Sequence, residues 1–184
     1  MKIIDTKLAG LILLEPKIFT DSRGCFFETY HRPKYGEIGV DKNFVQDNLS
    51  RSVRGTLRGM HFQIQHPQGK LVQVLQGDVF DVAVDLRSGS PTFGQWEGFY
   101  LNDTNHRQLY IPEGFAHGFV ALSESVLFHY KCTEIYRPED EGGLLWNDPA
   151  VGINWPISHP IVSAKDLEFE SLNALSADAL PHVQ

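Results

Sequence analysis

Residues 56–72 contain a group of side chains that could bind an anion or move a proton. They are Arg58, His61, His66 and Lys70. No acidic residue lies between Asp47 and Asp78, although the whole chain has a formal net charge of -7. A basic stretch in an acidic protein indicates an anionic ligand, because the overall field would otherwise repel such a ligand. A solvated basic loop would have the same charge pattern.

Three residues of the chain would suit acid–base chemistry without a cofactor. His61 can act as a base near neutral pH, Lys70 supplies a fixed positive charge, and Tyr130 is a phenolic acid. These groups suit the removal of a proton from carbon next to a ketone, because an ammonium group stabilises the enolate where water is excluded. A base on one face and an acid on the other would invert the carbon. Taken singly, each residue is equally compatible with a structural role in a β-protein.

Other chemistries fit the sequence less well. A metal site on a small barrel usually needs His-x-His with a carboxylate, but Gln63 stands two residues after His61, and no Asp or Glu follows before Asp78. Neither a strand–turn–helix nucleophile elbow nor a glycine-rich phosphate loop is present. We therefore expect no bound metal and no cofactor.

Length and composition predict a single domain over residues 1–184. Cys25 and Cys132 lie far apart with no secretory signal, which favours free thiols in a cytoplasmic protein. The apolar run over residues 8–14 is too short to span a bilayer and reads as a buried strand. Because the acidic balance argues against a nucleic-acid surface, we expect neither a nucleic-acid nor a membrane partner.

The elements that must position these residues are mostly short strands. Alternating or apolar runs predict strands over residues 11–14, 25–30, 44–48, 71–76, 79–86, 96–101, 107–111, 115–122 and 126–133. A Gly77-Asp78 turn predicts that two of them form a hairpin. Residues 33–39 have room for one helical turn, residues 139–156 form a long loop, and residues 163–175 form a helix with Ser163 as its N-cap. This pattern predicts an all-β jelly-roll sandwich or barrel with a few short helices.

Six short motifs occur in one order along the chain. They are residues 21–24 (DSRG), 46–48 (QDN), 57–63 (LRGMHFQ), 68–72 (QGKLV), 112–119 (PEGFAHGF) and 130–133 (YKCT). Together they resemble the dTDP-4-dehydrorhamnose 3,5-epimerase family, which has a cupin-like jelly-roll fold, from about residue 3 to residue 170. Met60 stands where a Leu is more usual, a change that conserves volume.

The resemblance implies a function. The family inverts C3 and C5 of dTDP-4-dehydro-6-deoxy-D-glucose, on the path to dTDP-L-rhamnose. By this resemblance, His61 would be the general base, Tyr130 the general acid, Lys70 the group that stabilises the enolate, and Asp166 the partner that orients His61.

The resemblance also implies further site residues. Substrate-binding positions would be Arg23, Glu28, Gln46, Asp47, Asn48, Arg58, His117, Glu141 and Lys165. Arg23 and Glu28 match residues that the family sends across a dimer interface, so a homodimer with its N-terminal strands at that interface is expected. Residues 163–184 are expected to form a helical tail.

The sequence leaves other interpretations open. The same motifs occur in relatives that act at only C5 or only C3 of related dTDP-linked sugars. A metal-dependent cupin oxygenase or isomerase and a non-catalytic sugar-binding barrel are two further classes. The missing His-x-His argues against the metal enzyme, and the joint presence of His61, Lys70 and Tyr130 argues against a mere binding module.

Overall fold

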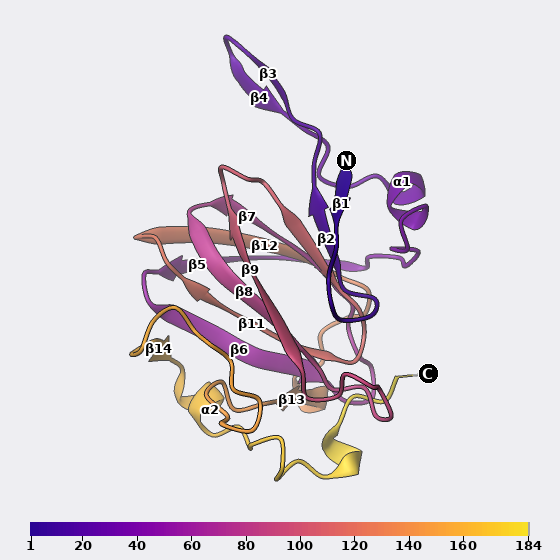
Figure 1. The fold of residues 1–184 in the computed structure, drawn as a ribbon, viewed down its shortest axis with the longest axis vertical. Coiled ribbons are helices and arrows are strands. Elements are labelled where there is room, and N and C mark those ends of the chain that lie inside the picture. Colours follow the sequence, from indigo (N-terminus) through magenta and orange to yellow (C-terminus); the bar gives the residue numbers. More distant parts are fainter. Residues whose placement is uncertain (184) are drawn as a thin grey trace.

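The computed structural model describes residues 1–183, which form two packed antiparallel sheets (Figure 1). The first has the strand order β1 (Lys2–Ile4), β2 (Ile12–Glu15), β10 (Gln108–Ile111), β7 (Lys70–Gln76), β12 (Ser125–Cys132) and β5 (Gln46–Val53). The second has the order β13 (Glu141–Gly143), β6 (Thr56–Gln63), β11 (Phe115–Ala121), β8 (Asp78–Asp85) and β9 (Trp96–Asn102), with β14 (Ile161–Val162) parallel to β6. The predicted jelly-roll architecture is confirmed.

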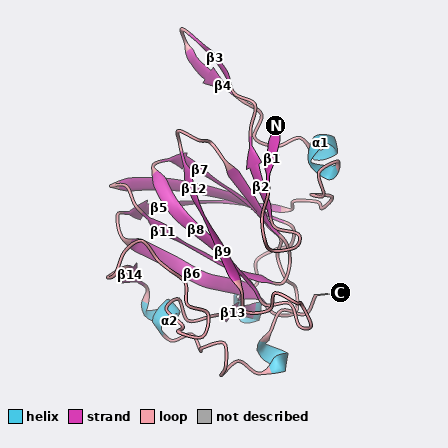
Figure 2. Cartoon of the chain, viewed as in Figure 1, coloured by secondary structure: helices cyan, strands magenta, loops and turns pink. Residues whose placement is uncertain are grey.

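Helices are few, as the sequence predicted. Figure 2 shows them at the edges of the sheets, and they are α1 (Arg32–Gly36), α2 (Ala164–Leu167) and two 3₁₀ turns at Pro138–Asp140 and Ala177–Ala179. Among residues 1–183, no helix has the length and apolar character needed to cross a membrane.

The main core lies between the two sheets. Val72 and Phe128 of the first sheet belong to the same buried cluster as Val79, Ala83 and Phe119 of the second. A second cluster covers the outer face of the second sheet, where the chain beyond residue 144 packs on strands β6, β8 and β11. Because β8 is buried on both faces, it has apolar residues on both, at five of its eight positions.

The predicted hairpin around Gly77 is wrong. Strand β7 pairs with β10 and β12, whereas β8 pairs with β9 and β11, so the turn carries the chain from one sheet to the other. Gly77 has a φ of 88°, and a Cβ there would lie 2.4 Å from the Ser125 carbonyl oxygen. The sequence therefore located both strands and the turn correctly but could not show which neighbours each strand chooses.

The predicted helix over residues 163–175 is also mostly wrong. Ser163 is the N-cap, with its hydroxyl accepting the Asp166 N–H, but α2 ends at Leu167. Beyond it the backbone bonds to the preceding loop instead: the Leu145 N–H donates to the Glu170 carbonyl and the Leu172 N–H to Asp148. These tertiary bonds outweigh the local helical preference, so residues 163–184 are not a helical tail over the part that is described.

Two irregular regions differ from expectation in detail. The loop predicted over residues 139–156 contains a 3₁₀ turn and β13, which pairs with β6. The strand predicted over residues 25–30 ends at Phe26, as half of a small hairpin of β3 (Phe19–Asp21) and β4 (Gly24–Phe26). Figure 1 shows that this hairpin projects away from the body of the molecule. Its residues Phe19 and Phe26 are largely exposed.

Candidate active site

Two adjoining hollows open between strands β5, β6, β7 and β12. The outer one has a volume of about 270 Å³ and is lined by Gln46, Asn48, Gln68, Tyr136 and Glu141, among others. The inner one has a volume of about 150 Å³ and is lined by Ser50, Arg58, His117, Phe119 and Phe128, among others. His61, Lys70 and Tyr130 line both hollows. The three residues that the sequence selected for acid–base chemistry therefore meet where the hollows join.

A bulge in β6 brings Arg58 and His61 to the same face. His61 is opposite His117 on β11 and Arg58 is opposite Phe119, so β6 has one residue more than β11 over this interval. Gly59 makes this approach possible, because a Cβ there would lie 2.6 Å from the Gly118 Cα. Strict alternation would have placed Arg58 and His61 on opposite faces.

His61 is held by Asp166. The ring Nε2 lies 2.9 Å from Asp166 Oδ1, and the other carboxylate oxygen accepts the Gly59 N–H at 3.1 Å. Burial alone would raise the pKa of Asp166, but the hydrogen bond and charge of His61, with the bond from Gly59, lower it below 3.8. A charged carboxylate at Nε2 favours the tautomer protonated there, which leaves Nδ1 as the proton acceptor. The His61 side chain is 32% exposed, so the ring remains accessible from the pocket.

Lys70 and Tyr130 lie on neighbouring strands β7 and β12. Lys70 is buried, and its Nζ lies 3.5 Å from the His61 carbonyl oxygen. Burial lowers the pKa of Lys70, while Cys132, Glu141 and Asp81 oppose that shift. Burial also raises the pKa of Tyr130. The phenol therefore keeps its proton at neutral pH, as a general acid must.

A second histidine pair is buried beside the first. His117 Nε2 lies 2.9 Å from Asp81 Oδ2 and 3.1 Å from Oδ1. Burial lowers the pKa of His117 although Asp81 opposes the shift, and burial raises the pKa of Asp81 although His117 opposes that one. Asp81 was missed from the sequence. The sequence signal that could have identified Asp81 is a carboxylate on an apolar strand whose other face carries Phe80, Val82 and Val84.

Glu141 and Tyr136 form the rim of the outer hollow. The Tyr136 hydroxyl donates to Glu141 Oε2 at 2.5 Å, Lys165 Nζ donates to the same oxygen, and Oε1 lies 4.0 Å from His61 Nε2. The hydrogen bond to Glu141 raises the pKa of Tyr136 to about 12. Burial would raise the pKa of Glu141, but Lys165 and Tyr136 lower it. Tyr136, which no sequence motif had indicated, thus joins Glu141 and Lys165 at the site.

Two predicted binding residues on β5 also face the site. Gln46 Nε2 donates to Asn48 Oδ1 at 3.0 Å, and the Gln46 carbonyl oxygen Oε1 accepts the Tyr136 N–H at 2.8 Å. A third predicted binding residue, Arg58 on β6, also faces the site. Its Nε donates to Ser52 Oγ at 3.1 Å, which fixes the guanidinium along the inner hollow.

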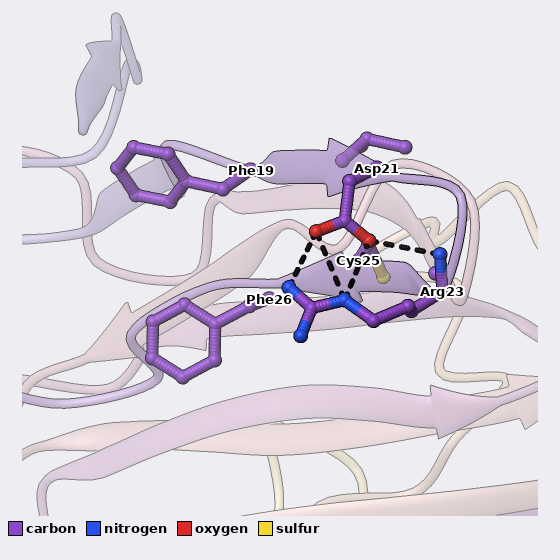
Figure 3. A pocket seen from close by; sticks show the side chains of 7 residues that line it. Phe19, Asp21, Arg23, Cys25 and Phe26 are labelled. Carbon is purple, nitrogen blue, oxygen red and sulfur yellow. Dashed lines mark hydrogen bonds and ion pairs between the residues drawn. The ribbon is translucent and has the colours of Figure 1, made fainter.

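Three of the predicted binding residues lie elsewhere in this chain. Asp47 alternates to the outer face of β5, where Lys131 Nζ donates to it at 2.9 Å. Arg23 is on the projecting hairpin, 88% exposed, and its guanidinium donates to Asp21 (Figure 3). Glu28 accepts from Lys34 at 3.0 Å near the base of the hairpin.

The described residues include two free thiols and no candidate metal site. Within residues 1–183, His, Cys, Asp and Glu side chains do not gather in groups of three or more that could hold a metal ion. Cys25 is an exposed free thiol and Cys132 a buried one, the latter accepting from Asn48 Nδ2 at 3.6 Å.

Fold and site define a class of protein: a cupin-like jelly roll with an acid–base pocket between its sheets. The model of the dTDP-4-dehydrorhamnose 3,5-epimerase family matches residues 5–174. A protein of that name from Methanothermobacter thermautotrophicus is 52% identical over 174 residues, covering 93% of this chain and 94% of the relative. The chain belongs to the dTDP-4-dehydrorhamnose 3,5-epimerase family.

Solved structures agree with this assignment. The crystal structure of dTDP-6-deoxy-D-glucose-3,5-epimerase from Legionella pneumophila, in complex with dTDP-4-keto-L-rhamnose, superposes with a TM-score of 0.96 at 50% identity, covering 100% of this chain and 98% of that one. A more distant relative, dTDP-4-dehydrorhamnose 3-epimerase from Streptomyces niveus, is 41% identical over 168 residues, covering 90% of this chain and 81% of the relative.

Proposed function

We propose that this chain is a cofactor-independent epimerase that inverts C3 and C5 of dTDP-4-dehydro-6-deoxy-D-glucose. The product would be dTDP-4-dehydro-L-rhamnose, an intermediate of dTDP-L-rhamnose biosynthesis. The observation that carries the proposal is the meeting of His61, Lys70 and Tyr130 where the two hollows join. Family membership and the dTDP-sugar bound by the Legionella pneumophila relative support the choice of substrate.

The reaction needs one proton removed and one returned at each carbon. His61, oriented by Asp166, takes the proton from carbon next to the C4 ketone. The electron pair of the C–H bond moves to the ketone oxygen, and the Lys70 ammonium stabilises the enolate. Tyr130 then gives its proton to the opposite face, which inverts the carbon, and the same sequence at the other carbon completes the reaction. Solvent restores both groups to their starting protonation states.

Binding of the substrate involves residues from both hollows. Gln46, Asn48, Arg58, His117, Glu141 and Lys165 would contact the sugar nucleotide within one chain. Arg23 and Glu28 would reach the pocket of a second copy in a homodimer. The projecting β3–β4 hairpin, whose exposed Arg23 lies outside the pocket of its own chain, supports this arrangement.

The remaining parts of the proposal concern cellular context. We place the enzyme in the cytoplasm as a single jelly-roll domain over residues 1–184, with no nucleic-acid or membrane partner. Its product would supply rhamnose for lipopolysaccharide or other cell-wall polymers.

Solvent-isotope incorporation tests the proposed reaction and its regiochemistry together. Incubation with substrate in deuterated water should place deuterium at both C3 and C5, as read by NMR of the product. Exchange at one carbon alone would identify a mono-epimerase, and no exchange at either would refute the enolate route. Prior dialysis against a chelator should leave the rate unchanged, whereas loss of activity restored by a divalent metal would favour a metal-dependent enzyme.

A further inference from the structure

A row of small polar side chains on β5 forms one wall of the site. In the β5–β12 ladder, Asn48 is opposite Tyr130 and Ser50 is opposite Phe128. Residues directly opposite each other on antiparallel strands point to the same face. Phe128 is part of the core between the sheets, so Ser50 also points into the sandwich.

Ser50 differs from its neighbours in the row. Gln46 and Asn48 bond to each other at 3.0 Å, and Ser52 accepts from Arg58 Nε at 3.1 Å. The Ser50 hydroxyl is buried and has no hydrogen-bond partner within residues 1–183. An unpaired buried hydroxyl is unfavourable, and such groups are rare in folded proteins unless a ligand or other partner uses them.

The Ser50 side chain lines the inner hollow. The volume of that hollow, about 150 Å³, is comparable to cavities that hold one six-membered ring in other proteins. Phe119 and Phe128 stack beside it with their ring centroids 4.1 Å apart. His117 and Arg58, which also line it, already have the partners Asp81 and Ser52.

We propose that Ser50 Oγ binds a secondary hydroxyl of the sugar ring, at C2 or C3, and thereby selects for a ring that carries it. This rests on the proposed function. A 4-keto-6-deoxy hexose linked through C1 has hydroxyls only at C2 and C3, because C4 is a ketone, C5 closes the ring and C6 is a methyl group. The ketone oxygen is assigned to Lys70, so Ser50 contacts one of the two remaining hydroxyls.

Calorimetric binding of two ligands tests this assignment. dTDP-6-deoxy-D-glucose has a C4 hydroxyl in place of the ketone and is not epimerised, while dTDP alone has no sugar. Ser50→Ala should weaken binding of the dTDP-sugar about 2- to 12-fold, the loss typical of one hydrogen bond, and should leave binding of dTDP unchanged. Ser125→Ala is the matched control, because Ser125 is on β12 opposite Val53, at the end of the same ladder and on its outer face. It should alter neither affinity.

Deoxy analogues then identify the hydroxyl. Of the 2-deoxy and 3-deoxy forms of the dTDP-sugar, one should bind the wild type and Ser50→Ala equally, because the group that Ser50 contacts is missing. Equal weakening of dTDP and of the dTDP-sugar by Ser50→Ala, or no weakening of either, would overturn the assignment. If the wild type itself binds no dTDP-sugar, the epimerase proposal falls, and this one with it.

Discussion

The pocket contains two His–Asp pairs that look alike and differ in their surroundings. His61 and His117 face each other across β6 and β11, and each ring lies 2.9 Å from a carboxylate oxygen. The His61 side chain is 32% exposed and that of His117 only 8%. Asp166 lies on the short helix α2, and Asp81 on the buried strand β8.

The two carboxylates are both buried, yet their pKa values shift in opposite directions. Asp166 has a lowered pKa, because hydrogen bonds from His61 and Gly59 outweigh its burial. Asp81 has a raised pKa, because burial outweighs its contact with His117. The first pair is therefore an accessible base held by a charged carboxylate. The second is a pair for which burial disfavours charge, since the pKa of His117 is also lowered. Hydrogen-bond geometry alone therefore does not assign a role to a His–Asp pair: the exposure of the histidine and the partners of the carboxylate decide it.

The largest effect is expected from His61→Asn. Asparagine cannot take up a proton, so turnover should fall on the order of 10²- to 10⁴-fold, the usual contribution of a positioned acid–base group. A coupled assay for the 4-keto-L-sugar product measures this, with circular dichroism as the check that the fold persists. Near-normal turnover would show that His61 is not the base.

Asp166→Asn should come next, with turnover reduced roughly 10²-fold. The amide can still accept the Gly59 N–H, but it no longer stabilises the imidazolium that forms when His61 takes a proton. A kcat that falls while KM stays constant would support this positioning role. A loss confined to KM would instead make Asp166 a residue for substrate binding.

A smaller effect is expected from His117→Asn. Because His117 lies in the inner hollow with a lowered pKa, we expect it to bind substrate as a neutral imidazole. Its loss should raise KM about 10-fold, the equivalent of one hydrogen bond, with a lesser change in kcat. If kcat instead falls as far as in His61→Asn, the two pairs do not have separate roles.

The smallest effects concern the pH dependence of stability, and they should have opposite signs. Between the lowered folded-state pKa of Asp166 and 3.8, the unfolded chain binds a proton that the folded chain does not, so stability increases with pH. The stability advantage of the wild type over Asp166→Asn should therefore widen as pH rises through this window. Denaturant titrations from pH 2 to 7, which include this window, provide the measurement.

The buried His117–Asp81 pair should give the opposite dependence of stability on pH in the same titrations. Between 3.8 and the raised folded-state pKa of Asp81, the folded chain retains a proton that the unfolded chain has lost. The stability of the wild type relative to Asp81→Asn should therefore fall as the pH rises above 3.8. If the stability differences of Asp166→Asn and Asp81→Asn from the wild type change with pH in the same direction, the two His–Asp pairs do not differ as described.

Sequence patterns predicted much of the fold and only part of this site. Period-two alternation located most strands and showed that Phe128, Tyr130 and Cys132 share a face, because a half-buried strand needs this pattern. Pairing depends on partners distant in the chain, so the turn at Gly77 was mistaken for a hairpin. The early end of α2 has the same origin, since bonds to residues 145 and 148 replaced those of a longer helix.

Within the site, residue chemistry and the motif resemblance identified His61, Lys70 and Tyr130 and several of their neighbours, but not Asp81 or the bulge in β6. The β6 bulge puts Arg58 and His61 on one face, which no alternation rule would predict. Asp81 becomes a partner of His117 only when β8 and β11 pair. Both depend on tertiary register, which the local sequence does not contain.

Hydrogen exchange catalysed by two variants shows which histidine removes the proton, a role that we assign to His61 and not to His117. The rate of deuterium incorporation at C3 and C5 is measured in deuterated water with saturating substrate for the wild type, His61→Asn and His117→Asn. We expect that His61→Asn loses exchange at both carbons, whereas His117→Asn retains it within about 10-fold of the wild type. Persistent exchange in His61→Asn, or equal loss in His117→Asn, would contradict this assignment.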